Sequence, residues 1–405
     1  MSTDPTTTDP IAADQVQADP FEALAGAIGS PPQHYGNPLH EQRLLADGAA
    51  IVDLSHRAVL TITGPDRLTW LDSVTSQALA RLQPGDSAET LLLDPSGRLE
   101  YAVRVFDDGV SAWLLLEEDA AGPLHTWLDR MRFMLRVEVA DRTAEFATIG
   151  TLGSPDLAAA SPNGVPLAWR DPWIAVTAGG HQYAQTPEHP AAQWTYTELL
   201  IERDRLAEAA ALPAAGTLAL EALRIAAWRP RQATESDERT IPHELDWLRS
   251  AVHLSKGCYR GQETVAKVHN LGHPPRRLVL LHLDGSEGVL PVHGDPVVAI
   301  QQVLATTDPV ADAASLGSAL RESDASPAEL VPAEKEVGRI TSSALHYELG
   351  PIALAVVKRS TDPTANLVVH SAEVAIAAAQ EIIVPTDAGA EANVPRLPRL
   401  GAVKR

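Results

Sequence analysis

The chain has 405 residues, of which 45% are hydrophobic and 21% are charged, and its formal net charge is −21 at pH 7. This length predicts two or three domains, and the negative charge argues against general binding to nucleic acids, whose phosphates need a basic surface. No stretch of about 18 apolar residues is present, so we expect no membrane-spanning helix and no membrane partner. The single cysteine and the lack of a basic, apolar leader at the N-terminus predict a cytoplasmic location.

Residues 1–37 are rich in Thr, Asp, Pro and Ala without periodicity, which predicts a disordered tail. From residue 38, short apolar runs alternate with the turns 94–97 and 107–109, a spacing that indicates antiparallel strands. Apolar residues at helical spacing over 124–135 predict a helix that covers this sheet. The predicted strands are 60–63, 91–93, 99–106, 110–116, 137–139 and 173–177, and the other predicted helices begin at 66 and span 198–209 and 217–228.

After residue 276, strand-like segments are separated by glycine and proline, which predicts a C-terminal β-barrel over 276–385. Ala, Ser, Asp, Glu and Pro dominate 306–334, which we interpret as a mobile insert between barrel strands. A second disordered tail is predicted over 386–405. The predicted fold class is α+β, with antiparallel sheets and helices over 38–275 followed by the barrel. The predicted barrel strands are 278–283, 297–301, 338–342, 352–357 and 372–383.

The segment 256–263, KGCYRGQE, contains Cys258, the only cysteine of the chain. A lone thiol forms no internal disulfide and supplies no self-contained metal site, so we predict no metal. Lys256 and Arg260 would stabilise a thiolate and make Cys258 the reactive group. The alternative is a buried cysteine that serves only as a small apolar residue.

The other residues of this segment suit a loop that wraps around a small group. Gly257 and Gly261 permit backbone conformations that other residues avoid. Tyr259 offers a ring face or a hydroxyl group. Gln262 and Glu263 would hold the loop or contact a ligand, and Glu263 would also begin a helix.

This octapeptide resembles the signature of the YgfZ family of folate-binding proteins, in which Arg260 occupies the variable position. That family is related to the aminomethyltransferase (GcvT, T-protein) of the glycine cleavage system. Weaker motifs in the same order extend the resemblance over roughly 39–385. The resemblance implies a GcvT-like fold, with a folate-binding region over 38–275 and the barrel after it. It also implies tetrahydrofolate or another folate as cofactor. The weaker motifs are DLS at 53–55, LLLDPSG at 91–97, ALRI at 222–225, IPHEL at 241–245 and VGRITSS at 337–343.

Two positions depart from the aminomethyltransferase pattern. The aspartate that these enzymes need for one-carbon transfer corresponds to about Tyr101, and a glutamate that reads the pterin corresponds to about Ala226. Glu100, the nearest acid, is expected on the opposite face of its strand. The resemblance places Arg224 on the helix that faces folate, and Trp228 beside it is a candidate to pack on a pterin. Arg224, Trp228 and Tyr101 are therefore the predicted folate contacts.

The resemblance implies a folate-binding accessory protein for the assembly or repair of iron–sulfur clusters. Its partners would be folate and iron–sulfur client proteins, and Cys258 would act as a nucleophile or as a temporary iron ligand. The first alternative is a folate-dependent one-carbon transferase that acts on protein or RNA. The second is a binding module that holds folate or a partner without chemistry. The sequence leaves open whether the protein is an enzyme.

Overall fold

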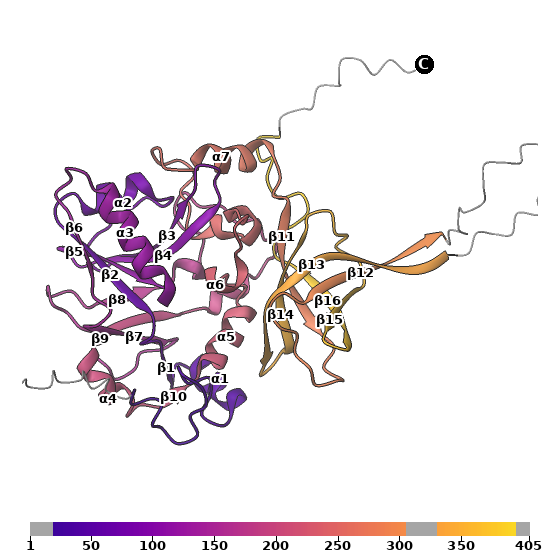
Figure 1. The fold of residues 1–405 in the computed structure, drawn as a ribbon, viewed down its shortest axis with the longest axis horizontal. Coiled ribbons are helices and arrows are strands. Elements are labelled where there is room, and N and C mark those ends of the chain that lie inside the picture. The colour runs from indigo at the N-terminus through magenta and orange to yellow at the C-terminus, as the bar shows by residue number, and fades with distance from the viewer. Residues whose placement is uncertain (1–18, 305–329, 394–405) are drawn as a thin grey trace, which may run out of the picture.

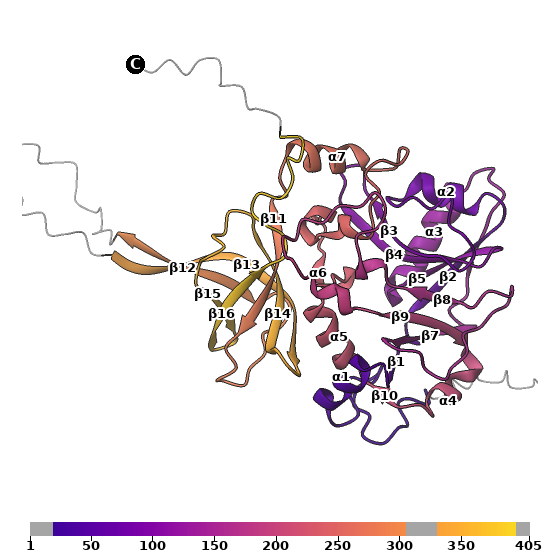
Figure 2. The same ribbon diagram turned by 180° about the vertical axis from the view of Figure 1, so that it is seen from behind.

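The computed structural model describes residues 19–304 and 330–393. Figures 1 and 2 show a larger part, built of sheets and helices, beside a barrel formed by the C-terminal strands. The predicted α+β architecture with a C-terminal barrel is confirmed. Across these described residues, no helix combines the length and the apolar character needed to cross a membrane.

Two five-stranded sheets form the larger part. The first has the order β3-β4-β5-β2-β6 and is antiparallel throughout. The second has the order β10-β1-β7-β9-β8, in which β1 and β10 are the parallel pair. The strands of the first sheet are β2 (Ala58–Thr63), β3 (Ser87–Leu93), β4 (Leu99–Asp107), β5 (Ser111–Leu116) and β6 (Glu138–Asp141). Those of the second are β1 (Ile51–Asp53), β7 (Phe146–Thr151), β8 (Ala168–Arg170), β9 (Thr197–Glu202) and β10 (Ala214–Ala215).

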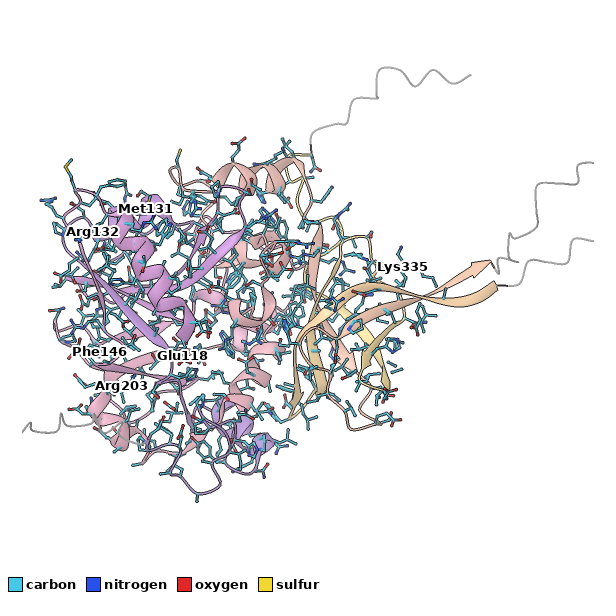
Figure 3. All side chains as sticks on the ribbon, in the orientation of Figure 1. Glu118, Met131, Arg132, Phe146, Arg203 and Lys335 are labelled. Atoms are coloured by element: carbon cyan, nitrogen blue, oxygen red, sulfur yellow. The ribbon has the colours of Figure 1, made fainter. Side chains whose placement is uncertain are left out.

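The helices cover the sheets and connect them to the barrel. As its spacing predicts, α3 buries Leu124 and Leu128 against the first sheet. The helix ends at Met131 rather than at the predicted residue 135, and Leu135 is exposed; Figure 3 shows Met131 and Arg132 near this end. α5 packs on α1 and on the barrel strand β13, between the sheets and the barrel (Figure 1). The α-helices are α1 (Pro38–Ala46), α2 (Arg67–Val74), α3 (Ala121–Met131), α4 (Leu206–Ala209), α5 (Thr217–Ala226), α6 (Gln232–Glu235) and α7 (Gln262–Leu271).

The barrel is closed and has the order β11-β14-β13-β12-β15-β16. Side chains alternate along β11, so Leu278 packs toward the sheets while Val279 packs inside the barrel. β12 and β13 extend beyond the barrel as a two-stranded arm, on which Lys335 is exposed (Figures 1 and 3). The barrel strands are β11 (Arg276–Leu283), β12 (Pro296–Leu304), β13 (Leu330–His346), β14 (Gly350–Lys358), β15 (Leu367–Ser371) and β16 (Val374–Ile382).

Two predicted elements differ from the structure, and one barrel strand was not predicted. The predicted strand 173–177 is a 3-10 turn, because Asp171 accepts a hydrogen bond from the Trp173 backbone N–H at 3.0 Å. The predicted helix 198–209 begins as strand β9, since pairing with β7 and β8 outweighs local helix propensity. The predicted strand 372–383 is confirmed as β16, which begins at Val374 after a turn with Ala372 at a left-handed φ of 49°, whereas its hairpin partner β15 was not predicted.

Parts of both predicted disordered tails are ordered. Residues 19–37 are ordered, because Phe21 is fully buried and Glu41 accepts hydrogen bonds from the backbone N–H groups of Tyr35 and Asn37. Residues 386–393 pack on α7, where the Glu391 N–H donates to the His269 carbonyl at 2.9 Å. In the predicted insert, 330–334 belongs to β13. Residues 1–18, 305–329 and 394–405 lie outside the described residues.

Candidate functional site

The cysteine loop, residues 256–261, is held at its first end by Lys256. The Lys256 ammonium donates to the carbonyl oxygens of Asp72, Thr75 at 2.8 Å and Gln77 at 2.9 Å. These groups lie at the C-terminal end of α2, where a cation is favoured by the helix dipole. Burial lowers the pKa of Lys256, although the Asp72 carboxylate at 3.5 Å opposes this effect. Lys256 therefore attaches the loop to α2.

Arg260 holds the second end of the loop. Its guanidinium makes two hydrogen bonds to the Glu100 carboxylate on β4, at 2.7 and 3.1 Å. A two-pronged pair of this kind fixes orientation as well as distance. Each of the two side chains is about one-third exposed, 33% for Arg260 and 32% for Glu100. The loop is thus connected to the first sheet through one ion pair.

The two glycines of the loop have different surroundings. Gly261 has a left-handed φ of 84° and precedes α7, and a Cβ atom there would lie 2.6 Å from the Asp94 carbonyl oxygen. Gly261 therefore packs against the β3–β4 turn at a distance that only glycine permits. A Cβ atom at Gly257 would meet no atom within 4 Å. Only Gly261 is required by the local backbone.

The thiol of Cys258 is free and exposed. Next to it, Tyr259 is buried, and the Lys256 ammonium lies 5.4 Å from its ring centroid. Burial raises the pKa of Tyr259, so this residue is a neutral phenol. Gln262 closes the loop by donating to the Lys256 carbonyl at 3.4 Å, while Glu263 is exposed in the first turn of α7. Because Lys256 and Arg260 pair with groups outside the loop, their effect on the thiolate stays a prediction.

A second candidate region, the central cavity, lies between the sheets and the connection from α5 to α6. Its interior has a free volume of about 60 Å³, and the empty space is about 550 Å³ when the mouth that opens to solvent is included. The interior has room for a few water molecules. Charged and aromatic side chains form its walls, and the arginines among them are Arg57, Arg104, Arg224, Arg229 and Arg231.

Glu198 on β9 binds two of these arginines. Arg57 and Arg104 donate to the same carboxylate oxygen at 2.6 and 2.8 Å, and the Tyr196 hydroxyl donates to it at 2.9 Å. Glu198 is fully buried. Buried charges are tolerated when they are paired and hydrogen-bonded in this way. This cluster fixes the back of the cavity.

Arg231 lies at the mouth and is the most exposed of the five arginines, with 25% of its side chain accessible. It binds Glu117 at 2.7 Å and Glu221 at 3.1 Å. Burial raises the pKa of Glu117, but Arg57 and Arg231 outweigh this effect and hold the pKa well below its usual range. The acids at the mouth are therefore ionised at neutral pH.

Arg224 connects the cavity to the barrel. It donates to Glu221 at 2.7 Å and to Glu235 at 2.9 Å. The second oxygen of Glu235 accepts hydrogen bonds from Thr341 at 3.1 Å and Ser342 at 2.6 Å, both on β13. This chain of contacts holds the barrel against the cavity.

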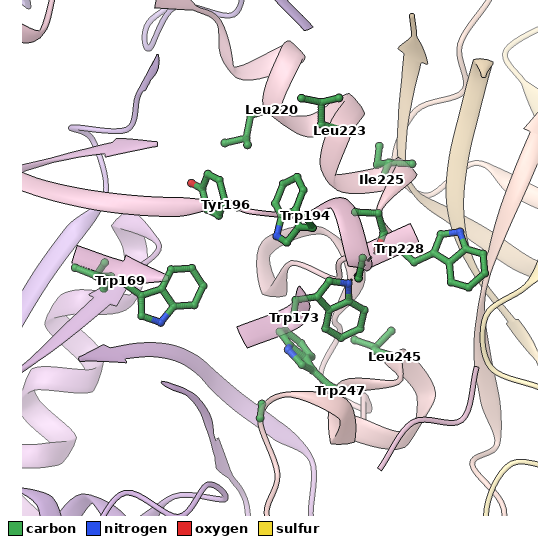
Figure 4. Close-up of a cluster of buried hydrophobic side chains, with 14 of the residues drawn as sticks. Trp169, Trp173, Trp194, Tyr196, Leu220, Leu223, Ile225, Trp228, Leu245 and Trp247 are labelled. Atoms are coloured by element: carbon green, nitrogen blue, oxygen red, sulfur yellow. Dashed lines mark hydrogen bonds between the residues drawn. The ribbon is translucent and has the colours of Figure 1, made fainter. Parts of the chain in front are cut away.

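Aromatic rings form another part of the wall, and Figure 4 shows Trp169, Trp194, Tyr196 and Trp247 among them. Trp194 and Tyr196 stack with ring centroids 5.1 Å apart, and Asp171 accepts the Trp194 indole N–H at 2.8 Å while it also binds Arg229. Trp247 is 1% exposed, and its indole N–H has no partner among the described residues. Buried donors are normally paired. The Trp247 N–H therefore marks a position where a ligand or water acceptor belongs.

The structure separates the residues that the sequence predicts to contact folate. Arg224 lines the cavity. Trp228 is buried outside it, against the His189 ring at 5.1 Å, and Figure 4 shows it nearest the barrel. Tyr101 lines a different, shallow depression together with Glu100 and Trp127. Cys258 is not among the described residues that line the cavity.

Most of the cavity wall could not be predicted from the sequence. The missed residues come from distant segments and share no local motif. One signal was available, because Arg104 interrupts an apolar strand and a charge at an inward position needs a buried partner. The missed residues include Arg57, Glu89, Arg104, Glu117, Asp171, Trp194, Tyr196, Glu221, Arg231, Gln232 and Trp247, together with Glu198 behind the wall.

Comparison with solved structures places this geometry in a known architecture. The crystal structure of the glycine cleavage system aminomethyltransferase T from Bartonella henselae superposes with a TM-score of 0.62 at 15% sequence identity, and the match covers 90% of this chain and 96% of that one. The chain has the aminomethyltransferase fold. The predicted GcvT-like fold is thereby confirmed, while the narrower resemblance to the YgfZ family stays a prediction.

The chain is also similar in sequence to aminomethyltransferases. Aminomethyltransferases of Streptomyces coelicolor and Herpetosiphon aurantiacus are each 26% identical, over 81% and 66% of this chain and 91% and 76% of theirs. A putative chloroplastic transferase of Arabidopsis thaliana is 25% identical over 58% of this chain, which spans only 57% of the length of that relative. No protein-family profile matches the chain.

Proposed function

We propose that the protein binds tetrahydrofolate or a related folate in the central cavity and acts through the cysteine loop in the assembly or repair of iron–sulfur clusters. Similarity to aminomethyltransferases supports the folate. The exposed Cys258 on a loop attached at both ends supports a role for the thiol. That loop is the observation that carries the proposal, because its sequence distinguishes the chain from the aminomethyltransferase pattern.

The residues of the cavity fit a pterin and its acidic tail. Stacked rings and unpaired buried donors, which here are the Trp247 indole N–H and the Arg57 Nε–H, are what a flat heterocycle with acceptor atoms requires. Trp247 would donate to a ring acceptor, and Trp194 and Tyr196 would offer apolar ring surface. Arg231 at the mouth would meet a carboxylate of the glutamate tail. Because the interior is only about 60 Å³, side chains at the mouth must move when the ligand enters.

In this proposal the two regions have separate tasks. A bound tetrahydrofolate would carry a one-carbon unit. Cys258 would meet the client from the solvent side, as a nucleophile or as a temporary ligand to iron of the client's cluster. Lys256 and Arg260 hold the loop, so the sulfur is presented at a fixed place on the surface.

A folate-dependent one-carbon transferase that acts on protein or RNA is the second candidate. It is favoured by the similar sequences, which are named aminomethyltransferases or a putative transferase. Turnover of methylene-tetrahydrofolate with a protein or RNA acceptor would favour it over the accessory function. Full function of Cys258→Ser would instead favour a binding module without thiol chemistry.

Calorimetry with tetrahydrofolate tests the cavity and the loop separately. Wild type and Cys258→Ala should bind with equal Kd, while Trp247→Phe should weaken binding by about 3- to 10-fold, the value of one neutral hydrogen bond. In cells without the native copy, Cys258→Ala should fail to restore cluster-dependent enzymes under oxidative stress. Absence of binding by wild type would reject the folate, and full restoration by Cys258→Ala would reject the thiol.

A further inference from the structure

The wall of the central cavity and the cysteine loop are joined by an unbroken series of contacts. We infer that Gln232 and Glu100 are positioning residues that transmit ligand occupancy of the cavity to the Cys258 thiol. The inference rests on the proposed function, since it takes the ligand to be tetrahydrofolate.

The first contact of the series joins the cavity to β4. Gln232, the first residue of α6, lines the cavity. Its amide oxygen accepts the Ala102 backbone N–H at 2.6 Å, and its amide nitrogen donates to the Glu100 carbonyl at 2.7 Å. β5 pairs with β4 only from Arg104 to Asp107. The Gln232 side chain therefore takes the place of a neighbouring strand at the edge of β4.

This arrangement makes Gln232 and β4 move together. If Gln232 shifted alone, a backbone N–H and a backbone carbonyl of β4 would lose their partners, which is costly where water does not replace them. Gln232 also follows Arg231, the cation at the mouth, whose side chain binds Glu117 and Glu221. A ligand that displaces Arg231 or contacts Gln232 therefore acts on the backbone of β4 at Glu100.

The second contact joins β4 to the thiol. The Glu100 carboxylate holds Arg260 through two hydrogen bonds, and Arg260 is two residues from Cys258. The other end of the loop is attached to the α2 region through Lys256, whose partners Asp72, Thr75 and Gln77 are not among the described residues that line the cavity. A displacement of Glu100 thus moves one end of the loop while the other end stays in place. The exposure of the sulfur between them must change.

The single cysteine makes this inference directly measurable. N-Ethylmaleimide modifies the intact protein only at Cys258, so mass spectrometry gives the labelling rate of one thiol. In wild type, saturating tetrahydrofolate should change this rate by about fivefold or more, in the range of typical coupling between sites. Arg260→Gln and Glu100→Ala should each reduce the ligand-induced change to less than about 1.5-fold, because both remove the same ion pair. Having two variants keeps the test valid if one of them folds poorly.

Calorimetry on the same samples separates lost coupling from lost binding. Glu100 is not among the described residues that line the cavity, so Glu100→Ala should bind tetrahydrofolate with an unchanged Kd. Glu208→Ala, which removes an exposed ion pair with Arg205 far from this series, is the matched control and should retain the full ligand-induced change. Wild-type binding without a change in labelling rate would overturn the inference and leave the proposed function standing. Absence of wild-type binding would overturn both.

Discussion

In the central cavity each of the five arginines is paired with carboxylates that are largely buried. In the cysteine loop, by contrast, both cations pair with groups outside the loop, and the thiol is exposed to solvent. The cavity is thus a fixed set of charges and rings, suited to recognising a ligand of defined shape. The loop exposes one reactive atom between two points of attachment. The cavity therefore depends on buried charge pairs and the loop depends on its two attachments. We expect substitutions in the cavity to lower the free energy of unfolding more than substitutions in the loop.

The largest expected effect is on the stability of the cavity. Glu198→Gln removes the charge that pairs with Arg57 and Arg104, two guanidinium groups that are almost fully buried. Leaving buried charges uncompensated should lower the free energy of unfolding by about 3–5 kcal/mol, measured by urea denaturation. Glu208→Gln, in an exposed pair with Arg205, should cause no measurable loss. Equal effects of the two substitutions would show that burial of the cavity charges has no energetic importance.

A smaller effect is expected in the loop, where the two glycines form a matched pair. Gly261→Ala would place Cβ 2.6 Å from the Asp94 carbonyl oxygen at a φ of 84°, and backbone strain of this kind costs about 1–3 kcal/mol. Gly257→Ala has open space around it and should change the free energy of unfolding by less than about 0.5 kcal/mol. Thermal unfolding of both variants provides the measurement. A loss at Gly257 as large as that at Gly261 would contradict the described packing of the loop.

The fold was largely predictable because its elements have local signals. Apolar periodicity predicts α3, and the turns at 94–97 and 107–109 predict the hairpins of the first sheet. The helix predicted over 198–209 was wrong, since Glu198 and its neighbours have helical propensity but gain more from pairing in β9. Tertiary pairing of this kind leaves no trace within a short window of sequence.

The candidate site was predictable only in part, for the same reason. The cysteine loop is continuous in sequence and could be found from eight residues. The cavity brings together Arg57, Arg104, Glu117, Glu221 and Trp247 from separate segments, and only the fold makes them neighbours. The sequence also suggested that Lys256 acts on the thiol, whereas the structure shows it bound to three carbonyl groups of the α2 region. Charge near a cysteine in sequence does not reveal the partner of that charge.

The last expected effect develops only in acid and concerns the boundary between the two regions, where His243 supports α7. Its ring nitrogen Nε2 donates to the Val265 carbonyl at 3.0 Å, and the ring is fully buried. Burial lowers the pKa of His243 to about 3, whereas a histidine in an unfolded chain has a pKa of about 6.5. Below pH 6.5 the histidine therefore binds a proton in the unfolded state but not in the folded state. The contribution of the neutral His243 to the free energy of unfolding is fully present above this pH and is lost as the pH falls toward 3.

His243→Gln isolates this contribution, because the amide can donate to the Val265 carbonyl without titrating. The difference in free energy of unfolding between wild type and His243→Gln should shrink by up to about 1.4 kcal/mol per pH unit between pH 6.5 and 4, measured by urea denaturation at several pH values. His40→Gln, at an exposed position, is the control and should leave the wild-type pH profile unchanged. A wild-type profile parallel to that of His243→Gln would mean that water reaches the ring. In that case the contact of α7 with His243 would be open to solvent, and the end of the cysteine loop that precedes α7 would depend on the Arg260–Glu100 pair and on the packing of Gly261.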